Sequence, residues 1–330
     1  MTRALLVATA ALGTASVALM IVAVAPPAQE ALALAKRPFR IGAIHAAFAP
    51  NHPAFEGLKA GLKELGLEEG RDVTFDNRFT EGRFEVMPGM AAELVTAGVD
   101  LIFAVGEAAT RAAMASTPKI PVVFTVVGDP VAAGVVAEIA RPGGNVTGVS
   151  SLYTELVAKR LEILKTLFPA LRRVWALYYP ADASEQEAVR RAQEAAPLLK
   201  LEVVARPVRT PAELAGALKS LRPGDGLLAP SSPALDIPGQ IAERTTRVPS
   251  VFPAVFWVRH GVLVSYGSDY FAEGRQAARL VAKLLRGARP RDLPVEGSNT
   301  IELGINLKTA KTLGLAIPQT LRLRANHLVE

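Results

Sequence analysis

Short apolar runs alternate with amphipathic segments along the first half of the chain. Phe55, Leu58 and Leu62 recur at the spacing of one helix face before Gly66, a residue that commonly ends a helix. Residues 101–105 are apolar throughout, which is typical of a strand buried on both faces of a parallel sheet. The same criteria predict strands at residues 39–44, 73–75, 122–126 and 146–149, and helices at residues 87–96, 108–114 and 131–139.

The second half repeats this alternation of strand and helix. Helices are predicted at residues 153–167, 185–199, 212–221 and 237–246, and strands at residues 174–178, 201–208, 226–229 and 251–252. The segments 262–266, 272–285 and 301–305 follow this second set, and we expect them to cross back between the two halves. The pattern therefore predicts an α/β protein with two Rossmann-like lobes, each built on a parallel sheet and joined by a multi-strand hinge.

The lobe boundaries follow from breaks in the two periodicities. The turn Pro142-Gly143-Gly144-Asn145 interrupts both, so we expect the first crossing between the lobes there. Lobe 1 is predicted to contain residues 36–148 and about 265–290, and lobe 2 residues 149–264 and about 291–330.

The N-terminal segment indicates the compartment. Arg3 precedes an uncharged, apolar run over residues 4–29, and the small-residue triplets Ala31-Leu32-Ala33 and Ala33-Leu34-Ala35 follow it. These are the parts of a secretory signal peptide, so residues 1–35 are predicted to be removed before Lys36 and the protein to reach the periplasm. An uncleaved membrane anchor is the alternative, because the run approaches the length that spans a bilayer.

Composition excludes several classes of chemistry. The chain of 330 residues has no cysteine, which rules out a thiolate nucleophile, a disulfide and a cysteine-based zinc site. Its 37 basic and 31 acidic residues give a net charge of +6, but they are spread along the chain rather than clustered in a stripe. We therefore expect no nucleic-acid partner.

The motifs of common enzymes on this scaffold are also missing from the sequence. Gly148-Val149-Ser150-Ser151-Leu152 lacks the second glycine of a nucleophile elbow, and His45-Ala46-Ala47-Phe48 stands where a phosphate-binding glycine loop would follow the first strand. The four histidines are far apart in the sequence. We therefore expect no catalytic residue, no metal site and no cofactor, and predict that the protein is not an enzyme.

Several motifs, in the same order along the chain, resemble the substrate-binding proteins of ABC transporters, whose better-known members are tryptophan- and tyrosine-type binding proteins of bacteria. They are Glu81-Gly82-Arg83-Phe84, Ala91-Ala92-Glu93-Leu94-Val95, Val127-Gly128-Asp129-Pro130-Val131, the segment 140–148, Lys159-Arg160-Leu161-Glu162, Ser265-Tyr266-Gly267, Asp292-Leu293-Pro294-Val295-Glu296, the segment 305–311 and Gly314-Leu315. The resemblance implies a periplasmic-binding-protein-like fold that closes by hinge motion on a small-molecule ligand. It also implies a membrane-embedded ABC permease as partner, and we expect a monomer.

The carboxyl ends of the parallel strands are where such a fold binds its ligand. The candidate ligand-binding residues at or near such ends are His45, Ala46, Phe48, Gly106, Glu107, Ala108, Asp129, Ser151, Tyr153, Tyr179, Ser231, Tyr266 and Asp269. The chain departs from its relatives at Glu107 and Ala108, where they usually carry a small hydroxyl residue and a proline, and at Tyr179, where they often have asparagine.

Several of these residues have a structural alternative. Glu107 can cap the helix that it begins, or it can face the cleft, where it would repel a carboxylate and favour an amine. Asp129 can pair with a ligand ammonium group or cap the helix expected from Val131. The tyrosines can form walls of the cleft or belong to the core, Ser231 can donate a hydrogen bond or form a turn, and His45 can lie in a surface loop.

Taken together, these observations predict an extracytoplasmic binding protein for an amino acid or related amine-bearing compound with an apolar or aromatic part. An exported enzyme and a sensory module on the same fold are the alternatives, because fold alone does not determine function.

Overall fold

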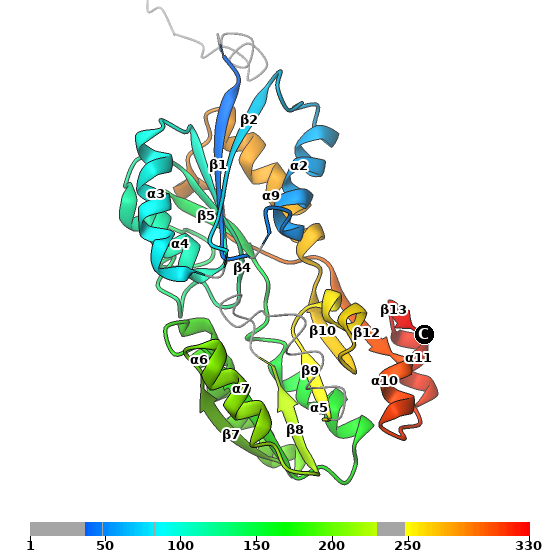
Figure 1. The fold of residues 1–330 in the computed structure, drawn as a ribbon. Coiled ribbons are helices and arrows are strands. Elements are labelled where there is room, and N and C mark those ends of the chain that lie inside the picture. Colours follow the sequence, from blue (N-terminus) through cyan, green and yellow to red (C-terminus); the bar gives the residue numbers. More distant parts are fainter. Residues whose placement is uncertain (1–36, 48, 82, 230–247) are drawn as a thin grey trace, which may run out of the picture.

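The computed structural model describes residues 37–330, apart from residues 48, 82 and 230–247 (Figure 1). Its first sheet has six strands. The strands are β1 (Phe39–His45), β2 (Val73–Phe79), β3 (Leu101–Val105), β4 (Val122–Val127), β5 (Val146–Ser150) and β11 (Glu296–Gly297). Their order is β11-β5-β4-β3-β1-β2, and every pairing is parallel. β3, β4 and β5 are buried at every position, which agrees with their continuous apolar sequences.

Helices cover both faces of this sheet (Figure 1). The 3-10 turn η1 (Phe84–Val86), α3 (Met87–Thr96) and α4 (Glu107–Ser116) pack on one face, and α2 (Pro53–Glu64) and α9 (Tyr270–Leu285) on the other. Helices α2 and α9 touch through glycines: a Cβ added at Gly274 would lie 1.8 Å from the carbonyl oxygen of Ala54. This close approach lets the late helix α9 complete the core of the first lobe.

The second sheet has seven strands in the order β13-β12-β10-β9-β8-β6-β7. They are β6 (Arg173–Tyr178), β7 (Glu202–Pro207), β8 (Asp225–Leu228), β9 (Ser250–Phe252), β10 (Val264–Ser268), β12 (Ile301–Asn306) and β13 (His327–Val329). Only the pairing of β10 with β12 is antiparallel. The prediction of two α/β lobes with parallel sheets is thus confirmed.

The helices of the second lobe build two cores, one on each side of its sheet. The first core includes α5 (Val157–Leu167), α6 (Ala183–Ala195) and the 3-10 turn η2 (Ala196–Leu199), and the second includes α7 (Pro211–Lys219) and η4 (Val255–His260). The short elements η5 (Pro290–Asp292), α10 (Leu307–Thr312) and α11 (Gln319–Arg324) come late in the chain. Among the described helices, none has both the length and the apolar character needed to cross a bilayer.

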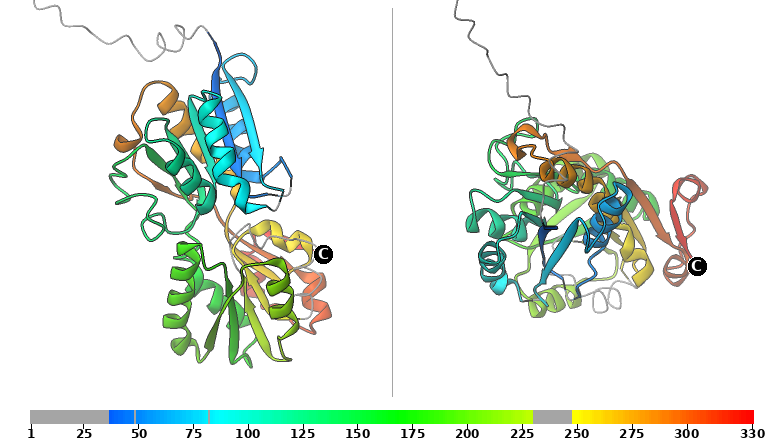
Figure 2. Two further views of the ribbon diagram at one scale, coloured as in Figure 1. Left: turned by 60° about the vertical axis from the view of Figure 1, so that its left-hand side comes forward. Right: turned by 90° about the horizontal axis from the view of Figure 1, so that it is seen from above.

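The chain passes between the lobes three times (Figure 2). It leaves the first sheet after β5, returns between β10 and α9, and leaves again between β11 and β12. The turn at residues 142–145, where we expected the first crossing, instead connects β4 to β5 within the first sheet. The glycines there allow a turn, but a turn alone does not carry the chain to another sheet.

One predicted helix is wrong. Residues 131–139 form turns rather than a helix, and Gly134 adopts a left-handed conformation with φ of +63°. The N–H groups of Val135 and Val136 both bond to the carbonyl of Pro130, which closes the segment into a compact loop. The predicted helix at residues 237–246 lies outside the described residues, and β11, β13, α10 and α11 were not predicted.

Candidate functional site

A pocket of 830 Å³ lies between the lobes at the carboxyl ends of β1 and β3. The first lobe contributes residues after β1, the turn η1, the start of α3 and one side of α4 along its length, while the second lobe contributes the loops after β6 and β7. The lining residues are Ala46, Phe84, Glu85, Met87, Pro88, Val105, Gly106, Glu107, Ala108, Ala109, Arg111, Ala112, Ala115, Ser116, Tyr179, Ala181, Asp182 and Arg209. Five predicted site residues are therefore brought together: Ala46, Gly106, Glu107, Ala108 and Tyr179.

The pocket combines an apolar wall with a charged rim. Phe84 and Met87 provide apolar surface together with the alanines of α4, and Tyr179 contributes an aromatic ring from the second lobe. Glu85 is exposed on the first lobe, and the Arg209 side chain, on the second, is 62% exposed. Among the described acidic groups, Glu213 is the ionic neighbour of Arg209, at 4.0 Å. Such a site can hold a small molecule that has an apolar body and charged ends.

Glu107 does not point its carboxylate at open solvent. Its Oε1 accepts hydrogen bonds from the Ala183 N–H at 3.0 Å and from Arg111 Nε at 3.0 Å. Its Oε2 accepts from the Ser184 N–H at 3.1 Å and from the Ser184 hydroxyl at 2.9 Å. Since Ala183 and Ser184 begin α6, a carboxylate from the first lobe lies against the N-terminus of a helix in the second lobe.

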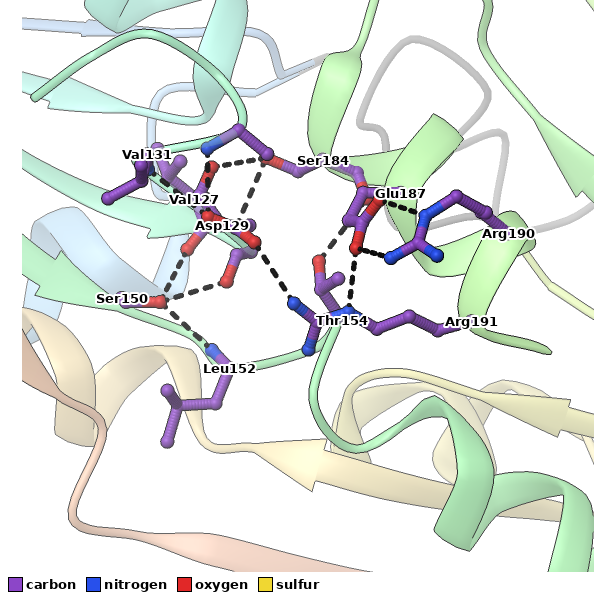
Figure 3. Close-up of polar contacts among 12 residues, drawn as sticks. Val127, Asp129, Val131, Ser150, Leu152, Thr154, Ser184, Glu187, Arg190 and Arg191 are labelled. Atoms are coloured by element: carbon purple, nitrogen blue, oxygen red, sulfur yellow. Dashed lines mark hydrogen bonds and ion pairs between the residues drawn. The ribbon is translucent and has the colours of Figure 1, made fainter. Parts of the chain in front are cut away.

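Ser184 also contacts the end of β4, as Figure 3 shows. The Asp129 N–H donates to its hydroxyl oxygen at 3.2 Å, and the Asp129 carboxylate lies 3.4 Å from Arg191 of α6. The other Asp129 carboxylate oxygen accepts from the N–H groups of Val131 and Ala132, and so caps the turn that follows. The Asp129 side chain is therefore bonded to the protein itself.

A second contact near the crossing joins Tyr153 to Asp182. The Tyr153 hydroxyl donates to Asp182 at 3.1 Å, while Asp182 caps α6 by accepting from the Glu185 N–H. Burial raises the pKa of Asp182, and the nearby carboxylates of Glu185 and Glu107 raise it further. The Tyr153 ring packs on Gly128, where an added Cβ would lie 2.4 Å from the ring, so any larger residue would displace the tyrosine.

A buried arginine fixes the backbone of two predicted site residues. Arg160 donates from Nη2 to the carbonyl of Tyr153 at 2.9 Å and from Nε to the carbonyl of Tyr266 at 2.8 Å. Burial lowers the pKa of Arg160 to about 10. Tyr266 lies on β10 and Tyr153 in the first crossing, so Arg160 ties this crossing to the second sheet. The arginine belongs to the motif Lys159-Arg160-Leu161-Glu162, but the sequence alone does not indicate this role.

The other predicted residues lie outside the pocket lining. His45 is fully buried rather than in a surface loop, its Nε2 is 3.0 Å from Asn77 Oδ1, and burial lowers its pKa to about 4. Ser151 is buried beside β4, and Asp269 caps α9 by accepting from two backbone N–H groups. Phe48 and Ser231 lie outside the described residues.

Val126 has a strained backbone just before the site. Its φ is +59°, which is rare for a β-branched residue, and the pairing of β4 with β5 shifts register between Phe124 and Val127. The Val126 N–H donates to Glu273, a fully buried carboxyl group on α9, at 3.1 Å. This irregular strand end turns the chain toward Gly128 and Asp129.

Sequence reasoning missed several pocket residues. Arg111, Asp182 and Arg209 line the pocket, and Ser184 joins the lobes, yet none was proposed. Asp182 had a usable signal, because Asp182 followed by Glu185 fits a helix capping pattern directly after a predicted strand. In the described part of the chain, no group of three or more histidine, aspartate or glutamate side chains could hold a metal ion.

Comparisons with known proteins place this geometry in a family context. A family model described as ABC transporter substrate binding protein matches residues 51–329. A tyrosine-binding protein of Clostridioides difficile is 29% identical over 276 residues, which cover 80% of this chain and 78% of that relative.

Two solved structures are similar over most of the chain at 25% identity. One is the ABC domain in complex with L-Trp from Streptococcus pneumonia, with a TM-score of 0.81 over 89% of this chain and all of the other. The second is the ligand-free, open structure of a substrate-binding protein with adhesive properties from Clostridium difficile, with a TM-score of 0.65 over 88% of this chain and 99% of that one.

Proposed function

The chain belongs to the ABC transporter substrate-binding protein family, and from this we propose that it captures an amino acid or a related amine-bearing compound between its lobes. The observation that carries the proposal is the 830 Å³ pocket between the lobes, with an apolar wall and charged residues from both lobes. Its volume lies within the range of roughly 300 to 1,000 Å³ that is usual for small-molecule sites.

The relatives support an aromatic ligand. One is a tyrosine-binding protein, and another was solved in complex with L-Trp. Phe84, Met87 and Tyr179 offer the surface that an aromatic side chain would contact.

The charged ends of an amino acid would need partners from the rim. Arg209 is suited to the carboxylate, because its guanidinium has only the distant Glu213 as ionic neighbour among the described acids. Glu85 is suited to the ammonium group, because it is exposed on the facing lobe. Glu107 and Asp129, the acids proposed from the sequence, already have protein partners.

Delivery to a membrane-embedded ABC permease completes the proposal. We propose that residues 1–35 direct export, that the mature protein begins at Lys36 in the periplasm, and that it acts as a monomer without a cofactor. N-terminal sequencing of protein from the periplasmic fraction tests the cleavage. Recovery of the intact N-terminus in the membrane fraction would instead indicate an anchored protein.

The binding proposal is tested by calorimetric titration with L-tryptophan and L-tyrosine. Tyr179→Ala should weaken the affinity more than tenfold by removing an aromatic contact. Arg209→Ala should weaken it about three- to tenfold, because a partly exposed pair contributes less. Lys219→Ala is the control, since Lys219 is an exposed cation of the same lobe outside the pocket. Equal effects of Arg209→Ala and Lys219→Ala would contradict the proposed site.

A further inference from the structure

We propose that Glu107 is a positioning residue that clamps the two lobes together by docking its carboxylate on the N-terminus of α6. The residue begins α4 in the first lobe, and three of its four hydrogen-bond donors belong to the second lobe. The inference concerns the ligand-free protein, so it goes beyond the proposed function and does not depend on which ligand binds.

The clamp is a complete polar contact. Each Glu107 carboxylate oxygen accepts two hydrogen bonds, all between 2.9 and 3.1 Å, and the residue is only 3% exposed. A carboxylate buried this deeply is costly unless its oxygens are bonded, and here all the usual positions are filled. The contact is therefore a specific polar interface between the lobes, in which no acceptor position of the carboxylate is left unbonded.

The N-terminus of α6 attracts the Glu107 carboxylate, and this attraction works against repulsion from Asp182, whose pKa the charge of Glu107 raises. The first N–H groups of α6 have no partners within their own helix, and the helix dipole adds partial positive charge at that end. Arg111, one turn after Glu107, holds the carboxylate from its own helix and also donates to the carbonyl of Ala133. Arg111 of the first lobe thus orients the carboxylate, and the N-terminus of α6 in the second lobe binds it.

Ser184 links this clamp to the neighbouring strand end. Its hydroxyl donates to Glu107 at 2.9 Å and accepts from the Asp129 N–H at 3.2 Å, and the residue is fully buried. One serine of the second lobe therefore contacts the ends of both β3 and β4 of the first lobe. A small rotation of one lobe would break both contacts together. These contacts therefore favour one relative orientation of the lobes, which we call the closed state.

The clamp also shapes the pocket. Glu107 and Asp182 both line it, one from each lobe, so their elements set the spacing between the wall of α4 and the wall that contains Tyr179 and Arg209. We infer that the clamp raises the closed population before a ligand arrives, because every contact that exists only in the closed state shifts the equilibrium toward it.

Small-angle X-ray scattering of the ligand-free protein tests the proposal. Glu107→Ala should have a larger radius of gyration than the wild type, and Glu107→Gln, which keeps the size of the side chain, should lie between them. Glu85→Ala is the matched control, because it removes the same charge from the same pocket and the Glu85 side chain makes no hydrogen bond or ion pair with any described residue. Unchanged radii in both Glu107 variants, or the same increase in Glu85→Ala, would overturn the clamp.

Rescue by sodium acetate separates docking from a general loss of packing. In Glu107→Ala, acetate can replace the missing carboxylate at the N-terminus of α6, so it should reduce the radius of gyration more than sodium chloride at equal ionic strength. The wild type should show no such difference. If acetate and chloride act alike on Glu107→Ala, carboxylate docking does not hold the lobes and the proposal fails. Because no test uses an amino-acid ligand, its failure is distinct from a failure of the proposed function.

Discussion

Two acidic residues at neighbouring strand ends are bonded to the protein rather than left open for a ligand. Glu107 lies on the N-terminus of α6, and Asp129 caps its own turn and faces Arg191. Their negative charges are therefore largely compensated within the molecule. A ligand ammonium group would need another partner, and Glu85 on the pocket rim remains exposed for that role.

Substitution of Asp129 distinguishes its structural role from ligand binding. Asp129→Asn keeps an oxygen that can cap the turn but loses the charge facing Arg191, so we expect a cost below about 1 kcal/mol. Asp129→Ala also loses the cap and should cost about 1 to 2 kcal/mol. Urea unfolding measures both. Calorimetry with L-tryptophan should show little change for Asp129→Asn, whereas a tenfold loss of affinity would indicate that Asp129 binds the ligand ammonium group.

Glu273 predicts a pH dependence of stability. Burial raises its pKa to about 8, and the charge of Asp269 adds to this rise, while the hydrogen bond from the Val126 N–H opposes it. In the unfolded chain the pKa returns to its ordinary value of 4.5. The folded state thus binds this proton more tightly, so its stabilising effect is complete below about pH 4.5 and is lost as the pH rises toward 8.

Glu273→Gln should remove this dependence. The free energy of unfolding of the variant minus that of the wild type should be larger at pH 8 than at pH 5, by on the order of 1 to 3 kcal/mol. The reason is that only the wild type loses the contribution of this proton over that range. Urea unfolding at the two pH values gives the difference. Glu138→Gln, at an exposed carboxyl group, is the control and should show the same difference from the wild type at both pH values. A Glu273→Gln effect that does not change with pH would contradict this prediction.

At the scale of elements, the packing of α9 on α2 depends on glycine. Gly274→Ala would place a Cβ 1.8 Å from the carbonyl oxygen of Ala54, so the two helices must separate. We expect a loss of about 1 to 3 kcal/mol in free energy of unfolding. Gly216→Ala, in the middle of α7 with no atom near the new Cβ, should instead stabilise by about 0.5 to 1 kcal/mol. Thermal unfolding of both variants gives the comparison, and a neutral Gly274→Ala would show that the helices can yield.

The elements that sequence predicted well are those set by local pattern. The apolar run of β3 and the helical spacing of Phe55 and Leu58 appear in the structure as expected. The segment 131–139 also has apolar residues at helical spacing, but Gly134 turns left-handed and Pro130 accepts two backbone bonds that close a loop. Local spacing cannot show such a loop, because its closure depends on backbone conformation rather than on side-chain pattern.

The candidate site was predictable only in part, for a related reason. The rule that ligands bind at the carboxyl ends of parallel strands identified Gly106, Glu107 and Tyr179, which line the pocket. It could not show that the Glu107 carboxylate meets Ser184, 77 residues later, because that contact depends on how the lobes are placed. Arg209 was missed because it follows β7, whose strand end was not considered.

At the scale of the whole molecule, three crossings join lobes that otherwise have separate cores. The crossings follow β5, β10 and β11, and the four buried clusters each lie mostly within one lobe. The contacts of Glu107, Asp129 and Tyr153 therefore join two lobes, and we expect these lobes to close by the hinge motion that is usual for this fold. Closure should be visible as a change of distance between the lobes without a change inside either lobe.

The absence of cysteine allows this closure to be measured directly. Because the chain has none, Ala92→Cys on α3 and Ala212→Cys on α7 would carry the only dyes, one on each lobe at an exposed position outside the pocket lining. Single-molecule energy transfer should show a shorter mean distance when L-tryptophan is added, because a ligand bound between the lobes stabilises the closed state. A same-lobe pair, Ala92→Cys with Lys119→Cys, should show no change.

The size of this ligand effect should depend on the clamp. In the Glu107→Ala background the ligand-free distance should be longer, so saturation with L-tryptophan should shorten it by more than in the parent pair. The apparent affinity should fall at the same time, since the ligand must then supply the free energy of closure that the clamp provided. If the distance between the dyes shortens equally and the affinity is equal in both backgrounds, Glu107 does not contribute to closure. If the distance shortens in neither background, L-tryptophan does not close the lobes.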